Sequence, residues 1–307
     1  MTTINSNDKI LLLWIKGNVT NQKKGYDEME EKVDVIKKER KSKISIAWIS
    51  FIIYLGLFLF GCATFENKQY TWLLLNLYSL ILDIILLIKY KFPKKKNILL
   101  AVGLSGIYIL SEITRFNPMS IIHMILVFLS TCAVTSVFNK EKEDALCWIK
   151  STRKKDILIT ILLGLIFGMV WGGINYLLMK GSNEIKSANI MQAFLLSLSP
   201  ATIEEISGRT VFYAFCLSLV HGKFTTKWQK FTFWFMMMIP HILPHTTECF
   251  SNGILNGLIS WIIITMLYVL VFGLVFAVLQ KKRDITSAMI AHGVVDFIRF
   301  CIFGLPV

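Results

Sequence analysis

The chain has 307 residues, of which 54% are hydrophobic and 17% are charged. This composition excludes an ordinary soluble domain, which has no use for so many apolar runs of about 20 residues. The formal net charge is +13, and nucleic-acid binding is one explanation of such a surplus. We set it aside because the cations lie in short segments between the apolar runs, as in the cytoplasmic loops of membrane proteins.

In chain order, the apolar runs predict an all-α fold, a polytopic transmembrane helical bundle of about eight to nine spans. The candidate spans are Ile44–Thr64, Thr71–Ile88, Asn97–Ile113, Pro118–Phe138, Ile157–Met179, Ala188–Val220, Phe231–Thr247, Gly253–Gln280 and Ile285–Phe303. The run 188–220 is too long for one straight crossing. Pro200 lies inside it, so we expect a kink or a short leading helix there.

Lys and Arg alternate between the predicted loops. Basic clusters precede the first span and follow each even-numbered span, at 37–43, 89–96, 140–155, 223–230 and 281–283. The alternate loops, around Glu66, Arg115, Glu184 and Glu248, carry few cations. Because cytoplasmic loops are enriched in Lys and Arg, we predict a cell-membrane protein with its N-terminus in the cytoplasm and its C-terminus outside.

Two further patterns concern packing. Gly164, Gly168 and Gly172 recur every four residues and therefore share one helix face, which predicts a close approach of another helix. The six cysteines include no C-x-x-C pair, so we predict neither a disulfide framework nor a cysteine metal site.

Ionisable side chains inside apolar spans are costly and call for a reason. Asp83, Glu112 and His123 lie near span ends, where exposure at the interface accounts for them. The last third of the chain differs, because seven such residues lie deep in three spans: Glu204, Glu205, Arg209, His241, His245, His292 and Asp296. A polar network that only holds helices together is one interpretation. A functional site is the favoured one, since intramembrane ionisable groups usually mark function.

The spacing of these residues indicates a shared interior. Three pairs are four residues apart and so lie on one helix face each: Glu205 with Arg209, His241 with His245, and His292 with Asp296. A carboxylate and imidazoles are the groups needed to activate water. Glu204 is the candidate base, and the histidines could orient the water or stabilise an oxyanion.

Three strings in this region carry a resemblance. EEISGR at 204–209 matches E-E-x-x-x-R of the CAAX protease and bacteriocin-processing family, and HGVVD at 292–296 matches its last motif, a His followed four residues later by Asn or Asp. MMMIPHILPH at 236–245 stands where the family carries F-x-x-x-H. The chain thus resembles these type II CAAX prenyl endopeptidase-like membrane proteases over residues 188–303, the predicted protease core. We predict accessory transmembrane helices in 44–180 and a cytoplasmic segment in 1–43.

The resemblance implies an intramembrane endopeptidase in which a glutamate activates water with no metal or other cofactor. Carried over by position, the catalytic residues are Glu204, His241, His292 and Asp296, and the supporting residues are Glu205, Arg209 and His245. Asp296 stands where the family has Asn in its last motif.

The second motif leaves two candidates for its histidine. If it is His241, Met237 occupies the Phe position, and if it is His245, His241 does. Counted at 1.5 Å per residue from the cytoplasmic end, His241 lies about 15 Å deep and His245 about 21 Å deep. A site open to the cytoplasm therefore favours His241, although Pro240 and Pro244 disturb the helix.

Three other functions compete with proteolysis by glutamate. Histidines four apart with a carboxylate can bind zinc, although HILPH lacks the Glu of H-E-x-x-H. A non-enzymatic self-immunity or scaffold protein could use the same fold. A transporter could use a midplane proton relay, but no paired inverted halves are visible. The expected partners are the lipid bilayer and a membrane-associated peptide or protein of unspecified sequence, and the Lys- and Ile-rich composition is typical of bacteria.

Overall fold

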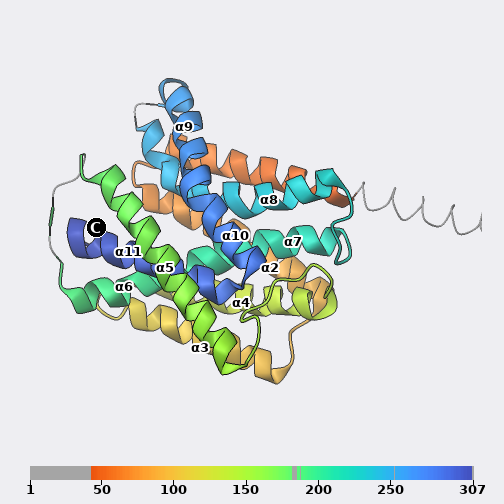
Figure 1. The fold of residues 1–307 in the computed structure, drawn as a ribbon. Helices are drawn as coiled ribbons and strands as arrows, with labels where there is room; N and C mark the ends of the chain where they lie inside the picture. Colours follow the sequence, from red (N-terminus) through yellow and green to blue (C-terminus); the bar gives the residue numbers. More distant parts are fainter. Residues whose placement is uncertain (1–42, 182–184, 187, 252, 306–307) are drawn as a thin grey trace, which may run out of the picture.

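The structure is a computed structural model that describes residues 43–181, 185–186, 188–251 and 253–305. All but the last residue of the predicted segment 1–43 lies outside the described residues. The helices are Lys43–Thr64, α2 (Lys68–Tyr90), α3 (Lys95–Ser111), α4 (Pro118–Lys140), α5 (Lys154–Met179), α6 (Ile190–Ile203), η1 (Glu204–Thr210), α7 (Val211–Leu219), α8 (Lys227–Ile242), η2 (Leu243–Phe250), α9 (Ile254–Tyr268), η3 (Val269–Gly273), α10 (Leu274–Lys282) and α11 (Ile285–Phe303). They pack together as one bundle (Figure 1).

The prediction of an all-α membrane bundle is confirmed by the described residues, which form helices and no strand. Six helices are long and apolar enough to cross a membrane: Lys43–Thr64, Lys68–Tyr90, Pro118–Lys140, Lys154–Met179, Ile254–Lys282 and Ile285–Phe303. Their outward faces carry large apolar side chains, such as Ile88 and Leu158, that are more than half exposed in the isolated chain. Lipid is the medium that suits such faces.

The bundle has two chemically different ends. We call the end with the connections 91–94, 141–153, 220–226 and 283–284 the basic end, because these connections and the helix ends beside them carry most of the described Lys and Arg residues. The other end, here the far end, carries the connections 65–67 and 112–117, the described residues between α5 and α6, and the end of α11. In Figure 1 the end of α11 lies at the far end, and the helix Lys43–Thr64 begins at the basic end.

The glycine face predicted on α5 is confirmed and packs against α11. A methyl group built on Gly164 would lie 2.7 Å from Ile290 Cβ, and one built on Gly168 would lie 2.5 Å from Val294 Cβ. Only glycine therefore lets the two backbones come this close. The contact matters for the site because α11 carries two of the predicted catalytic residues.

The helix does not end at Pro200, where we expected a kink or a short leading helix, but it changes its type four residues later. Pro200 lies inside α6, and the helix changes to the π-helical turn η1 at Glu204. At the end of η1 the Val211 N–H bonds to the Ile206 carbonyl, five residues back. Such π-turns are rare in proteins, and those that occur often lie at functional sites.

Candidate functional site

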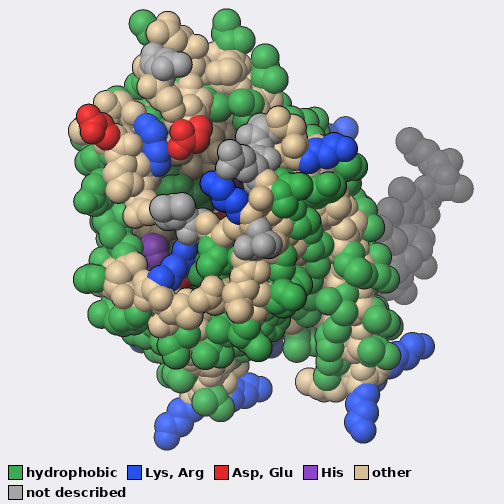
Figure 2. Space-filling model, turned by 90° about the vertical axis from the view of Figure 1, so that its left-hand side faces the viewer, with side chains coloured by type: hydrophobic (Ala, Val, Ile, Leu, Met, Phe, Trp, Pro, Cys, Tyr) green, Lys and Arg blue, Asp and Glu red, His purple; other side chains and the backbone are tan. Residues whose placement is uncertain are grey.

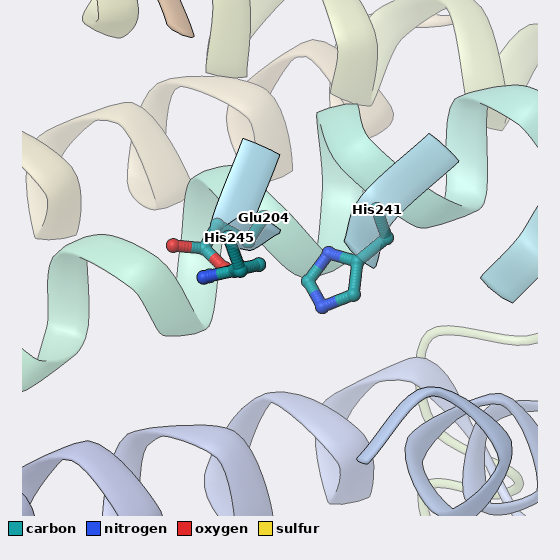
Figure 3. Close-up of side chains that lie close together, drawn as sticks. All are labelled: Glu204, His241 and His245. Atoms are coloured by element: carbon teal, nitrogen blue, oxygen red, sulfur yellow. The ribbon is translucent and has the colours of Figure 1, made fainter. Parts of the chain in front are cut away.

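The seven residues singled out in the sequence meet in the interior of the bundle. Four elements carry them, with Glu204, Glu205 and Arg209 on η1, His241 on α8, His245 on η2, and His292 and Asp296 on α11. Up to 92 positions separate them along the chain, yet each has another of the seven within 4.8 Å. Figure 3 shows how the first of the glutamates and the two α8–η2 histidines lie side by side.

Glu205 is the fully bound member of the glutamate pair. Its side chain is 0% exposed, and the equally buried Arg209 donates to both carboxylate oxygens, at 3.0 Å from Nε and 3.3 Å from Nη2. Gln280 Nε2 donates to it at 2.7 Å and His292 Nδ1 at 2.8 Å. A buried carboxylate needs such partners to offset its lost hydration. With every neighbour a donor, Glu205 is built to hold the site together.

Arg209 extends this network to two other elements. Its Nη1 donates to the backbone carbonyls of Met237 at 3.1 Å and of Gly273 at 2.9 Å. These carbonyls belong to α8 and to the π-turn η3. The Glu205–Arg209 pair therefore joins η1, α8 and η3, which fixes where the histidine-bearing segment sits.

Glu204, one residue earlier, has different surroundings. Its side chain is 15% exposed, its Oε2 lies 3.0 Å from His245 Nε2, and the same oxygen lies 3.7 Å from His292 Nε2. Among the described residues, its side-chain partners are imidazoles, and no Lys or Arg pairs with it. A carboxylate beside imidazoles and partly open to solvent can exchange protons, which the clamped Glu205 cannot do.

His292 links the two glutamates. Its Nδ1 donates to Glu205, so Nε2 points toward Glu204 and toward Asp296 Oδ2, at 3.4 Å. Phe276 stacks flat on the ring, with centroids 5.1 Å apart and planes 5° apart. A hydrogen bond at one ring nitrogen sets the orientation and tautomer of the other. The predicted pair of His292 and Asp296 is thus part of the same cluster.

His241 and His245 contact Glu204 in different ways. The His245 ring meets the carboxylate at hydrogen-bond distance, whereas the buried His241 ring lies within 4.8 Å of it. The His241 ring centroid lies 5.5 Å from that of His245 and 5.7 Å from that of His292. A methyl group on Gly208 would lie 3.3 Å from His241 Nδ1. Both candidates for the second-motif histidine therefore belong to the cluster.

The cluster includes donor sets of the kind that bind metals. The ligand atoms of Glu204, His241 and His245 lie within 4.8 Å of one another, as do those of Glu205, His241 and His292. Two imidazoles and a carboxylate are a known protein ligand set for zinc. The first set is the better candidate, because Glu205 in the second is already bound by Arg209 and Gln280.

A cavity of about 330 Å³ adjoins the cluster. Its lining residues are Asn175, Leu178, Met179, His241, Ile242, His245, Tyr268, Phe272, Phe276, His292, Val295, Asp296 and Arg299. They extend from His292 toward the far end, and none of them belongs to the basic end. The expectation that the site opens at the basic end, from which the depth of His241 was counted, is therefore wrong. Figure 2 looks onto the far end and shows a histidine in a recess of that face.

Sequence reasoning missed two buried polar side chains near the site. Gln280, at the end of a long apolar run, bonds to Glu205. Asp83 was attributed to interface exposure, but it is 0% exposed and accepts a 2.5 Å hydrogen bond from Ser130, which in turn bonds to Ser207 of η1 at 2.9 Å. The cost of a carboxylate in an apolar span was the signal available for Asp83.

Glu112 and His123 are likewise less exposed than expected. Glu112 is buried and forms an ion pair with Arg115, and His123 is bonded to Asn76 and Tyr108. Internal pairing rather than interface exposure accounts for both residues.

Comparison of the chain with models of known protein families, with curated proteins and with solved structures finds no match.

Proposed function

We propose that the protein is an intramembrane endopeptidase in which Glu204 activates the hydrolytic water. The observation that carries this proposal is the difference between the two adjacent glutamates. Glu205 is clamped by Arg209, Gln280 and His292, whereas the partners of Glu204 are the imidazoles of His245 and His292, which line the cavity. The resemblance of residues 188–303 to CAAX prenyl endopeptidase-like proteases supports the same assignment.

The reaction needs only groups that the cluster contains. Glu204 takes a proton from a water molecule as the water oxygen bonds to the carbonyl carbon of the substrate peptide. The imidazole of His245 or His241 donates to the oxyanion that forms. Glu204 then gives the proton to the amide nitrogen as the C–N bond breaks, which releases a carboxylic acid and an amine. His292 and Asp296, which line the cavity, contact each other, and His292 helps to position Glu204.

The proposal includes a placement in the membrane. The shorter α3 and the interrupted segments α6–η1–α7 and α8–η2 would bring the number of crossings to about nine. The Lys and Arg of the basic end support a cytoplasmic location for that end and for the N-terminus, in a bacterial cell membrane. The substrate would be a membrane-associated peptide or protein.

The test is a pair of matched glutamate substitutions. Glu204→Gln keeps the size and most hydrogen bonds but removes the base, so we expect peptidase activity to fall by about 10²–10⁴-fold with folding intact. Glu248→Gln, in η2 and outside the cluster, makes the same chemical change and should leave activity unaltered. Membrane peptidomes of cells carrying each variant would identify substrates, and the purified proteins would be assayed on them.

Other results would exclude the glutamate mechanism. Cleavage that survives both Glu204→Gln and Glu205→Gln would do so directly. Unchanged peptidomes together with a fully retained cellular phenotype in Glu204→Gln would favour a non-enzymatic self-immunity or scaffold function.

A second candidate is a zinc-dependent membrane protease, favoured by the close approach of Glu204, His241 and His245. Zinc held by these three ligands would leave a fourth position for water, as in catalytic zinc sites. A strong chelator separates the two candidates. Cleavage that is lost with chelator and restored by zinc would support the metalloenzyme, and cleavage that is unaffected would support the glutamate mechanism.

A further inference from the structure

We infer that the site takes its substrate from the extracytoplasmic side of the membrane, so that the substrate is an exported peptide or the external part of a membrane protein. The inference rests on the proposed function, because only a peptidase has a peptide substrate. Which end of the bundle gives access to the cavity next to the catalytic cluster is a property of the fold.

The cavity lining runs in one direction along three elements. At 1.5 Å per residue from the basic end, His292 on α11 lies about 10 Å in and Arg299 about 21 Å in. On α9–η3–α10, the lining extends from Phe276, about 9 Å in, to Tyr268, about 21 Å in. On α5 it reaches Met179, the last residue of the helix. On α5 and α11 the lining therefore runs from the catalytic cluster toward the far end, whereas on α9–η3–α10 it stops at Tyr268, in the middle of Ile254–Lys282.

The basic end is closed below the cluster by the connection 141–153. The N–H groups of Ile285 and Thr286, which begin α11, donate to the carbonyls of Cys147 and Trp148 at 2.9 and 3.1 Å. Lys281, at the end of α10, donates to the Asp144 carbonyl at 3.1 Å. This connection is thus hydrogen-bonded to the start of α11 and to the end of α10, and both of these helices line the cavity.

A buried polar cluster reinforces this closure. The Asp284 carboxylate is 0% exposed and accepts from the Thr160 hydroxyl at 2.6 Å and from the Lys150 N–H at 3.2 Å. It also accepts from the Ser287 N–H, in the first turn of α11. These bonds join α5, α11 and the connection 141–153. They block the approach of a substrate to the cavity from the basic end.

The distribution of charge assigns the two ends to the two sides of the membrane. The described Lys and Arg residues of the far end are Lys68, Arg115, Lys180, Lys186 and Arg299, whereas at the basic end each connection, taken with the helix ends beside it, has several. Connections rich in Lys and Arg stay in the cytoplasm. The cavity therefore opens to the outside.

The cavity walls indicate the kind of segment that would enter. Leu178, Met179, Tyr268 and Phe272 supply apolar surface, and Arg299 supplies a cation near the far end. Apolar walls suit the side chains of a peptide that is already in contact with the bilayer. A substrate of this kind reaches the mouth from the outer leaflet without crossing the membrane.

The experiment measures access directly and requires no proteolysis. The non-buried cysteines Cys147, Cys249 and Cys301 are replaced by Ser, and the buried ones, Cys62, Cys132 and Cys216, are retained. Asn175→Cys, in the cavity wall, and Lys94→Cys, at the basic end, are each added to this background. Both are treated with a membrane-impermeant maleimide in intact and in permeabilised cells.

We expect Asn175→Cys to be labelled in intact cells and Lys94→Cys to be labelled only after permeabilisation. Labelling of Lys94→Cys in intact cells would invert the orientation and overturn the inference. Labelling of Asn175→Cys that needs permeabilisation, or that fails in both conditions while Lys94→Cys reacts, would also overturn it. Because labelling is independent of turnover, an inactive protein with the expected pattern would refute the proposed function and leave the access route intact.

Discussion

The contact between α5 and α11 allows a quantitative prediction about how the site is positioned. A methyl group on Gly168 would lie 2.5 Å from Val294 Cβ and 2.9 Å from the Ala291 carbonyl oxygen. Favourable carbon contacts lie near 3.5–4.0 Å, so Gly168→Ala should push α11 away by about 1 Å. His292 lies between these two contact residues and should move with them. We expect a loss of about 1–3 kcal/mol in stability from overpacking, and of about 10²-fold in activity from misplacement.

The matched control is Gly173→Ala on the same helix, where an added methyl group meets nothing within 4 Å. Both variants gain the same helix propensity, about 0.8–1.0 kcal/mol, so their difference isolates the clash with α11. Thermal unfolding of the purified proteins in detergent measures the first effect, and peptidase rates measure the second. Equal melting temperatures for Gly168→Ala and Gly173→Ala would show that the glycine face does not hold α11 in place.

Two further substitutions test the network around Glu205. Arg209→Met leaves a buried carboxylate without its cation, so we expect a loss of about 3–5 kcal/mol in stability, seen as a lower melting temperature or as failure to accumulate; a wild-type melting temperature would contradict this. Gln280→Leu removes one of the donors to Glu205 and should cost about 1–3 kcal/mol in the same assay. An unaltered stability there would mean that Arg209 and His292 alone satisfy the carboxylate.

Local spacing in the sequence predicted the contacts that form within a single helix or along a helix face. Glu205 and Arg209, four residues apart, form the expected ion pair, and Gly168 meets α11 as a small residue should. Pro200 lies within the regular part of α6, and the helix changes to the π-turn only at Glu204, a position that the missing N–H of a proline does not specify. The resemblance indicated which residues would gather, and the structure brings them together.

Contacts set by the relative positions of helices could not be predicted in this way. Gln280 bonds to Glu205, which lies 75 positions earlier in the chain. Its local sequence does not distinguish it from an ordinary polar residue at the end of a helix. The direction of the cavity depends on how the connection 141–153 folds under α11, which no periodicity encodes. Asp83 shows the reverse case, because its cost in an apolar span was visible but its partner Ser130 was not.

The π-turn η1 gives a last prediction, since it changes where the backbone finds its hydrogen bonds. The Thr210 hydroxyl donates to the Glu205 carbonyl at 2.6 Å, and Gln280 reaches the same oxygen at 3.3 Å. Thr210→Val keeps the shape but removes that donor at a fully buried position, so we expect a loss of about 1–3 kcal/mol in stability.

Thr202→Val is the matched control for Thr210→Val. The Thr202 hydroxyl is also buried, but it bonds to the Leu198 and Ser199 carbonyls within its own α-helix. Hydroxyl bonds of this kind add little to carbonyls that already have helical donors. Thr202→Val should therefore lower the melting temperature less than Thr210→Val does. Equal effects would mean that the Thr210 hydroxyl does not support the π-turn. The different surroundings of Glu204 and Glu205 would then depend on the Arg209 contacts alone.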